Sequence, residues 1–287
     1  MKIFYSDDYI AASQAFDTTR KSGWIADSLV EDPVLGAELV APALITAAEL
    51  SQVHNPSYVN AVQTGAPLNL ASSQGFNWDP GLWRAVCAST GGAVAAAKEA
   101  LRSGVSGSLS SGLHHAKYSR GAGFCTFNGL VAAAHAALAD GCQSVLILDL
   151  DAHCGGGTHE MIGHERRVHH TDISVSSFDS YVPIKHNTLD VVKGDAEYLP
   201  IIRRRLQELE GVPFELCLYN AGMDPYDNHP GGLGVEVLRQ REELVFSWCK
   251  RRKLPVAFVL AGGYIGSNLS KQELVALHRL TITAATA

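Results

Sequence analysis

The chain has 287 residues, 46% of them hydrophobic and 18% charged, which is enough for one large α/β domain with a sizeable core. Its net charge of −6 argues against a nucleic-acid-binding surface, which would be basic, but is compatible with a cationic small substrate. No apolar run reaches the length of a membrane helix, so we expect no membrane partner. No linker or repeat divides the sequence, and we therefore predict a single domain over residues 1–287.

The six cysteines are scattered along the sequence and form no Cys-x-x-Cys pair, which predicts reduced thiols rather than a disulfide framework. The N-terminal segment MKIFYSDDYI lacks the long apolar run of a secretory signal. Both features lead us to expect a cytoplasmic protein. Nothing in the sequence indicates an oligomeric state.

The predicted elements alternate between strands and helices. Three continuous apolar runs of strand length are typical of strands buried on both faces of a parallel sheet. In chain order we predict a short strand and turn in residues 104–112, a helix in 127–141, a strand in 144–153, a helix in 198–211, a strand in 214–224, a helix in 238–253 and a strand in 255–264. This order predicts an α/β fold with one open, mostly parallel sheet and helices on both faces.

Each of the three apolar runs ends in polar or glycine residues. These are Asp149, Asp151 and His153 after the first run, Asn220 and Asp224 after the second, and Gly262, Gly263 and Tyr264 after the third. Open α/β sheets bind ligands outside the carboxyl ends of their strands. The adjacent pair His114 and His115 follows the strand predicted in residues 104–112, so we expect four segments to bring functional groups to one edge of the sheet.

The acidic residues at this edge suggest a metal site. Asp149, Asp151 and His153 would share a direction if the strand continued through them. Crowded, buried carboxylates favour a cation between them, although the aspartates would also serve as caps of the next helix. Asp224 would be a third ligand or, alternatively, a turn residue before proline. Three protein ligands are typical of catalytic zinc, but the same donors also suit iron(II) or manganese.

Four segments together resemble the histone deacetylase family, which includes acetylpolyamine amidohydrolases and shares its fold with arginases. They are GLHHAKYSRGAGFCTFNG, LILDLDAHCGGGT, NAGMDP and LAGGY, in the order and spacing of that family. HNPSYV, which begins at His54, resembles a weaker early motif. The resemblance covers residues 50–270 and implies an arginase/deacetylase-like fold.

The resemblance also implies an activity and a set of roles. The activity is removal of an acetyl or other acyl group from an acyl-lysine, an acylpolyamine or a related small molecule by metal-activated water. Asp151, His153 and Asp224 would bind Zn2+, with Fe2+ as the alternative. The roles implied for the remaining residues are general base and acid for His115, electrostatic support for His114 with Asp149 as its partner, a hydrogen bond to the oxyanion for Tyr264, and the walls of the acyl-lysine tunnel for Gly123 and Phe124.

A structural K+ ion is a second implied cofactor. Its site would be formed by Asp149, Asp151, His153, Asp172 and Ile173, with Asp172 in place of the usual serine.

Departures from the family pattern concern substrate recognition and the proposed base. Gly156 stands where relatives have the side chain that orients the second histidine, so another group or a water molecule must set the tautomer of His115. Asn77 and Asp79 lie near the position of a substrate-holding aspartate without matching it. His229 stands where many relatives have an aspartate. We therefore expect a competent amidohydrolase whose substrate need not be acetylated histone.

The sequence is also compatible with two alternative functions. The Asp151-Ala152-His153 segment is similar to an arginase motif, but a two-manganese ureohydrolase would need a denser acidic cluster. A non-catalytic zinc-binding sensor would explain Gly156, although none of the implied metal ligands is lost. The two histidines and Tyr264 favour the deacetylase.

Overall fold

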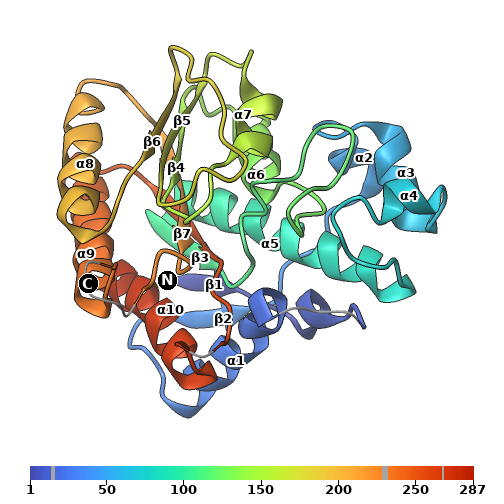
Figure 1. Cartoon of the computed structure of the whole chain (residues 1–287), viewed down its shortest axis with the longest axis horizontal. Coiled ribbons are helices and arrows are strands. Elements are labelled where there is room, and N and C mark those ends of the chain that lie inside the picture. The colour runs from blue at the N-terminus through green and yellow to red at the C-terminus, as the bar shows by residue number, and fades with distance from the viewer. Residues whose placement is uncertain (14–16, 228–231, 267) are drawn as a thin grey trace.

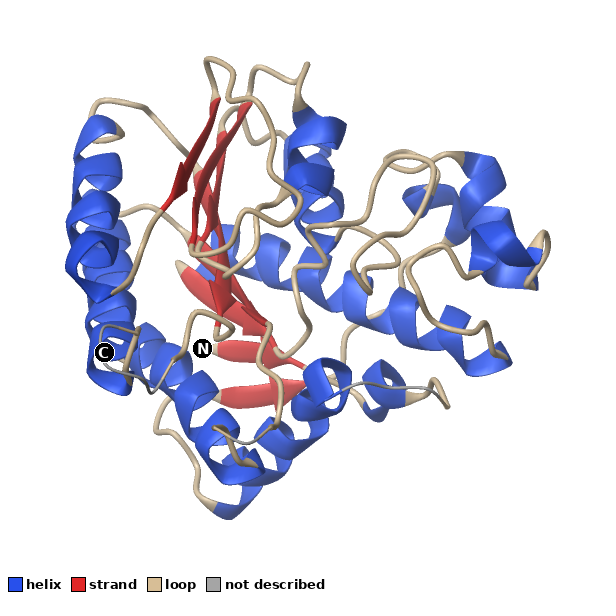
Figure 2. Cartoon of the chain, in the orientation of Figure 1, coloured by secondary structure: helices blue, strands red, loops and turns tan. Residues whose placement is uncertain are grey.

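The computed structural model describes residues 1–13, 17–227, 232–266 and 268–287. Its centre is one eight-stranded sheet, visible as the red strands of Figure 2. The strands are β1 (Lys2–Phe4), β2 (Glu38–Val40), β3 (Val105–Ser108), β4 (Val145–Asp149), β5 (Val168–Ser174), β6 (Asn187–Val191), β7 (Leu216–Gly222) and β8 (Val256–Ala261).

The sheet is open, and its neighbouring strands pair in parallel in the order β2-β1-β3-β8-β7-β4-β5-β6. The central strands β4, β7 and β8 are buried along their whole length. Continuous apolar sequence forms such strands because both faces of the sheet are covered. In the register of the sheet, Asp149 lies opposite Asn220 on one neighbour and Asp172 on the other.

Helices occupy the connections between the strands. They are a 3₁₀ helix η1 (Asp7–Ile10) and the α-helices α1 (Asp17–Glu31), α2 (Ala47–Leu50), α3 (Pro56–Thr64), α4 (Leu68–Ala71), α5 (Pro80–Ser103), α6 (Gly129–Ala139), α7 (Gly156–Ile162), α8 (Asp195–Glu208), α9 (Val235–Arg252) and α10 (Lys271–Thr286). None of the helices in the described part of the chain is both long and apolar enough to cross a membrane.

Two hydrophobic cores lie on opposite faces of the sheet. Successive residues of β4 alternate between them, with Leu146 and Leu148 in one core and Val145 and Ile147 in the other. Residues of α1, α8, α9 and α10 fill the first core, and residues of α5, α6 and α7 fill the second. Figure 1 shows these two groups of helices on the two sides of the strands.

The fold predicted from the sequence is confirmed: the sheet is open and parallel, with helices on both faces. The strands predicted in residues 144–153, 214–224 and 255–264 correspond to β4, β7 and β8. One detail was wrong. β4 ends at Asp149, so Asp151 and His153 lie on the loop after the strand rather than on the strand itself. The turn is stabilised by the Asp151 backbone N–H, which donates to Asp149 Oδ1 over 3.2 Å.

Candidate active site

Most of the residues expected at the carboxyl edge of the sheet surround one cavity of about 380 Å³. They reach it from loops that follow β3, β4, β7 and β8, four neighbouring strands. The candidate residues that line the cavity are His114, His115, Gly123, Phe124, Asp151, His153, Asp224 and Tyr264. Asp149 does not line it and instead lies behind His114.

Asp151, His153 and Asp224 form a cluster that could hold a metal ion. Each offers one ligand atom, and the three atoms all lie within 4.8 Å of one another. His153 Nδ1 is 3.3 Å from Asp151 Oδ1 and 3.4 Å from Asp224 Oδ2. Two carboxylates and one imidazole are suitable donors for a divalent transition metal. The residues present therefore fit the metal that the sequence implies.

Glycines allow the two carboxylates to approach this cluster. A Cβ atom at Gly222 would come within 2.4 Å of Asp151 Cα, and one at Gly262 would come within 2.2 Å of Asp224 Oδ1. Gly262 also has a left-handed backbone, with φ of 62°, which glycine adopts without strain. The next residue, Gly263, donates its backbone N–H to the Asp224 carboxylate. The Gly-Gly turn after β8 thus fixes the third candidate ligand.

The cluster electrostatically favours positive charge. Hydrogen bonds to Asp151 and Asp224 raise the pKa of His153 to about 9, despite its partial burial. The carboxylates therefore stabilise a cation at this point of the cavity.

His114 and Asp149 form a buried hydrogen-bonded pair. His114 Nδ1 lies 2.7 Å from Asp149 Oδ2, and Asn220 Nδ2 donates to Asp149 Oδ1 over 2.7 Å. Burial alone would lower the pKa of His114, but Asp149 and Asp151 outweigh it and raise the pKa to about 10. Burial likewise opposes ionisation of Asp149, yet His114 holds the pKa of that carboxyl below its usual range. The pair is therefore an imidazolium and a carboxylate at neutral pH.

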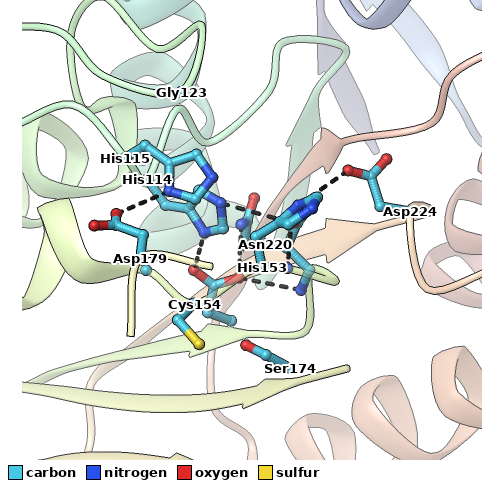
Figure 3. A network of polar contacts seen from close by, with 12 residues as sticks. His114, His115, Gly123, His153, Cys154, Ser174, Asp179, Asn220 and Asp224 are labelled. Atoms are coloured by element: carbon cyan, nitrogen blue, oxygen red, sulfur yellow. Dashed lines mark hydrogen bonds and ion pairs between the residues drawn. The ribbon is translucent and has the colours of Figure 1, made fainter. Parts of the chain in front are cut away.

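His115 has the opposite environment although it is the next residue. Its pKa is lowered, first by burial and then by the positive charge of His114, whose ring centroid is 4.1 Å away. His115 Nδ1 lies 2.9 Å from Asp179 Oδ2, a contact drawn in Figure 3. Asp179 belongs to the connection between β5 and β6 and was not predicted from the sequence. A neutral His115 with Nδ1–H bonded to Asp179 leaves its other ring nitrogen free to accept a proton.

Aromatic residues form the outer part of the cavity. The side chains of Phe124, Phe178 and Tyr264 are exposed while lining it, so its mouth lies among them. Gly123 brings the chain close to the proposed base, because a Cβ there would meet His115 Cδ2 at 2.5 Å. Burial and the charge of Asp224 raise the pKa of Tyr264, so its phenol stays protonated and able to donate a hydrogen bond.

Two of the residues implied for a potassium site, Asp149 and Asp172, lie side by side on neighbouring strands. Asp172 is fully buried on β5 directly beside Asp149, and burial with the charge of Asp149 raises its pKa to about 7. Its carboxylate accepts from the Gly155 backbone N–H and from the Ser174 hydroxyl, each over 2.7 Å. Ile173 follows on the same strand. Two buried, adjacent carboxyl groups are an environment in which a bound cation would relieve repulsion.

Other sequence candidates have different positions. Asp79 caps α5, since its Oδ1 accepts from the Gly81 backbone N–H over 2.8 Å. Asn77 is exposed and does not line the cavity. His229 lies outside the described residues. His54 supports the loops around the site, because its ring contacts the Lys117 carbonyl and the Asn128 backbone N–H, each over 3.0 Å.

The sequence matches the family description "Histone deacetylase domain" over residues 15–280. Among its relatives, histone deacetylase 2 of Arabidopsis thaliana is 29% identical over 315 residues, which cover 96% of this chain and 80% of that protein. The family match covers the loops after β3, β4, β7 and β8 that reach the cavity.

Two solved structures share the fold at low sequence identity. The HDA15 HD domain matches with a TM-score of 0.83 and 20% identity, covering 100% of this chain and 91% of that one. An acetylpolyamine aminohydrolase from Burkholderia pseudomallei matches with a TM-score of 0.79 and 18% identity, covering 100% of this chain and 99% of that one. These TM-scores show that both structures share the overall fold of this chain.

Proposed function

Because this chain belongs to the histone deacetylase family, we propose that it is a zinc-dependent amidohydrolase that removes an acetyl or other acyl group from an amine. The substrate would be an acyl-lysine peptide, an acylpolyamine or a related small acylated amine. The observation that carries this proposal is the convergence on one cavity of a three-residue metal cluster, a histidine pair and a tyrosine.

The metal would be held by Asp151, His153 and Asp224, which provide the number of protein ligands found in catalytic zinc sites. When bound, Zn2+ would polarise the amide carbonyl and lower the pKa of a water molecule. Fe2+ would suit the same three donors.

His115 would act as general base and then as general acid. Its lowered pKa keeps the ring neutral, so it can take a proton from the attacking water. The same proton would then pass to the nitrogen of the leaving amine. The hydrogen bond to Asp179 keeps a proton on Nδ1 of His115. The ring nitrogen that would accept the proton of the water molecule is therefore Nε2.

His114 and Tyr264 would stabilise negative charge that develops on the substrate. His114 remains positively charged through Asp149 and Asp151, and so supports an anionic transition state without exchanging a proton. Tyr264 would donate a hydrogen bond from its phenol to the oxyanion of the tetrahedral intermediate.

We also propose a structural K+ ion beside Asp149, Asp151, His153, Asp172 and Ile173, supported by the buried carboxyl groups of Asp149 and Asp172. The proposed compartment is the cytoplasm, in keeping with six cysteines that are all free and buried.

The function is tested with a panel of acyl-lysine peptides and acylated polyamines that differ in acyl length, assayed with zinc-loaded protein and with a hydroxamate inhibitor. We expect release of free amine from at least one member and inhibition by the hydroxamate. A protein that binds zinc and the hydroxamate but hydrolyses nothing would be the non-catalytic sensor. Urea release from arginine would identify the ureohydrolase instead.

A further inference from the structure

The space beside Gly156 is filled by Asp179, which is remote in the sequence. A Cβ atom built at Gly156 would lie 2.4 Å from the Asp179 carbonyl oxygen and 2.6 Å from Asp179 Oδ1. These distances are far below van der Waals contact, so no side chain fits at position 156 while Asp179 keeps its place. Asp179 can therefore occupy this position only because residue 156 is a glycine.

Asp179 is held in an unusual conformation. Its φ of 58° lies in the left-handed region, which only a small fraction of residues other than glycine adopt. Backbone strain of this kind persists where the surrounding structure fixes it, and it is often found at functional sites.

The loop that carries Asp179 is attached to the segment of the candidate metal ligands. The Cys154 backbone N–H donates to the Phe178 carbonyl over 3.0 Å, and the backbone N–H groups of Val175 and Ser176 donate to the Ala152 carbonyl over 3.0 and 2.8 Å. Ala152 and Cys154 flank His153 in the sequence. The position of Asp179 is thus fixed relative to the metal cluster.

The Asp179 carboxylate faces the proposed base directly. Asp179 Oδ2 is 2.9 Å from His115 Nδ1, and Asp179 Oδ1 is 3.6 Å from Lys117 Nζ (Figure 3 shows the histidine contact). A carboxylate accepts hydrogen bonds, so this contact selects the His115 tautomer with the proton on Nδ1.

We propose that Asp179 is the positioning residue of His115, and that the Gly156–Asp179 pair replaces an orienting side chain at position 156 with one from the β5–β6 connection. The catalytic consequence of this inference rests on the function proposed above. The same loop presents Phe178, whose ring centroid is 5.1 Å from that of His115 and whose side chain lines the mouth of the cavity. One loop would therefore both contact substrate and orient the base.

The test compares Asp179→Asn, Asp179→Ala and Gly156→Ala with a matched control, Asp190→Asn. Asp190 follows the same loop, its side chain is 17% exposed against 16% for Asp179, and it pairs with Arg204 and Arg205 away from the cavity. For Asp179→Ala and Gly156→Ala we expect kcat to fall by about tenfold to a hundredfold, as when a partner that orients a histidine in a metal site is removed. KM and hydroxamate affinity should stay within about twofold, because the metal cluster is untouched.

Asp179→Asn should give an intermediate kcat, since its amide oxygen still accepts from Nδ1–H without the charge, and Asp190→Asn should match the wild type. An unchanged kcat in Asp179→Ala would overturn the proposal. So would a loss of hydroxamate affinity that parallels the loss of kcat, because that would indicate a purely structural role.

A second readout does not depend on turnover. In zinc-loaded, ¹⁵N-histidine-labelled protein, the His115 signals are assigned by comparison with His115→Gln. We expect the Nδ1-protonated tautomer in the wild type and a mixture of tautomers in Asp179→Ala. An unchanged tautomer in Asp179→Ala would contradict the inference. If the wild type hydrolyses no substrate, the proposed function fails while this measurement still decides the role of Asp179.

Discussion

At the scale of single residues, the two adjacent histidines of the cavity differ in charge. The carboxylates of Asp149 and Asp151 keep His114 protonated, whereas burial and His114 itself keep His115 neutral. Groups with pKa values shifted in opposite directions are typical of acid–base sites. The pair therefore supplies one fixed positive charge and one proton acceptor within a single turn of chain.

Tyr264→Phe tests the proposed oxyanion donor. Removing one such donor should lower kcat by about a hundredfold or more, while the zinc content of the protein stays the same. Steady-state kinetics on the best substrate of the panel measures the effect. Tyr118→Phe is the control, because Tyr118 is 48% exposed against 44% for Tyr264 and does not line the cavity. Equal loss in both variants, or no loss in Tyr264→Phe, would contradict the assigned role.

The sequence predicted eight of the residues that line the cavity, but it did not identify Asp179, which lies behind His115. His114, Asp151 and Tyr264 stand in segments whose spacing resembles a known family. Asp179 contacts a residue 64 positions away, and no local pattern records such a contact. Gly156 was the available signal: it predicted that another group must orient His115, but a glycine does not specify which segment supplies that group.

At the scale of elements, the strands that could be predicted from the sequence are those buried on both faces of the sheet. β4, β7 and β8 are covered on both faces and read as continuous apolar runs. β5 is almost as deeply buried, but its sequence VHHTDIS contains the polar residues that contact Asp149, so its pattern resembles a loop. β1 and β2 are three residues long, too short for any periodicity to appear.

The loop between β3 and α6 depends on His54, and this predicts a pH effect on stability. Asn128 N–H donates to His54 Nε2, so the buried ring is neutral, and burial lowers its pKa from 6.5 to about 4. As the pH falls below 6.5, His54 becomes protonated in the unfolded chain before it does in the folded protein. Stability from this group is therefore complete above pH 6.5 and is lost towards pH 4.

Urea denaturation of the wild type and His54→Gln at several pH values measures this contribution. Between pH 6.5 and pH 5, we expect the free energy of unfolding to fall by roughly 2 kcal/mol more in the wild type than in the variant. If the difference in the free energy of unfolding between the two proteins stayed constant across that pH range, His54 would not titrate as described.

At the scale of the whole molecule, α9 connects two of the segments that form the candidate metal cluster. The fully buried Arg241 donates to the carbonyls of Leu150 and Gly222 over 3.2 and 2.7 Å, and pairs with Glu242. Leu150 precedes Asp151, and Gly222 lies two residues before Asp224. A helix on one face of the sheet thus fixes the edge where the site lies.

Arg241→Met should lower the free energy of unfolding by about 3 to 5 kcal/mol, because it leaves the Glu242 carboxylate buried without its partner. The double variant Arg241→Met, Glu242→Met removes both charges and should recover part of that loss. Urea unfolding measures both values. A single variant as stable as the wild type, or a double variant that is less stable than the single one, would contradict this interpretation.

In the proposed mechanism, one metal ion, held by residues from the ends of two neighbouring strands, supports amide hydrolysis. The most direct measurement is a titration of metal-free protein with Zn2+, following amine release and bound zinc per chain, in the wild type and in Asp224→Ala. We predict that wild-type activity rises with zinc and saturates at one ion in the cluster, and that Asp224→Ala loses both tight zinc binding and activity. Hydrolysis that is independent of metal, or that persists at full rate in Asp224→Ala, would contradict this mechanism.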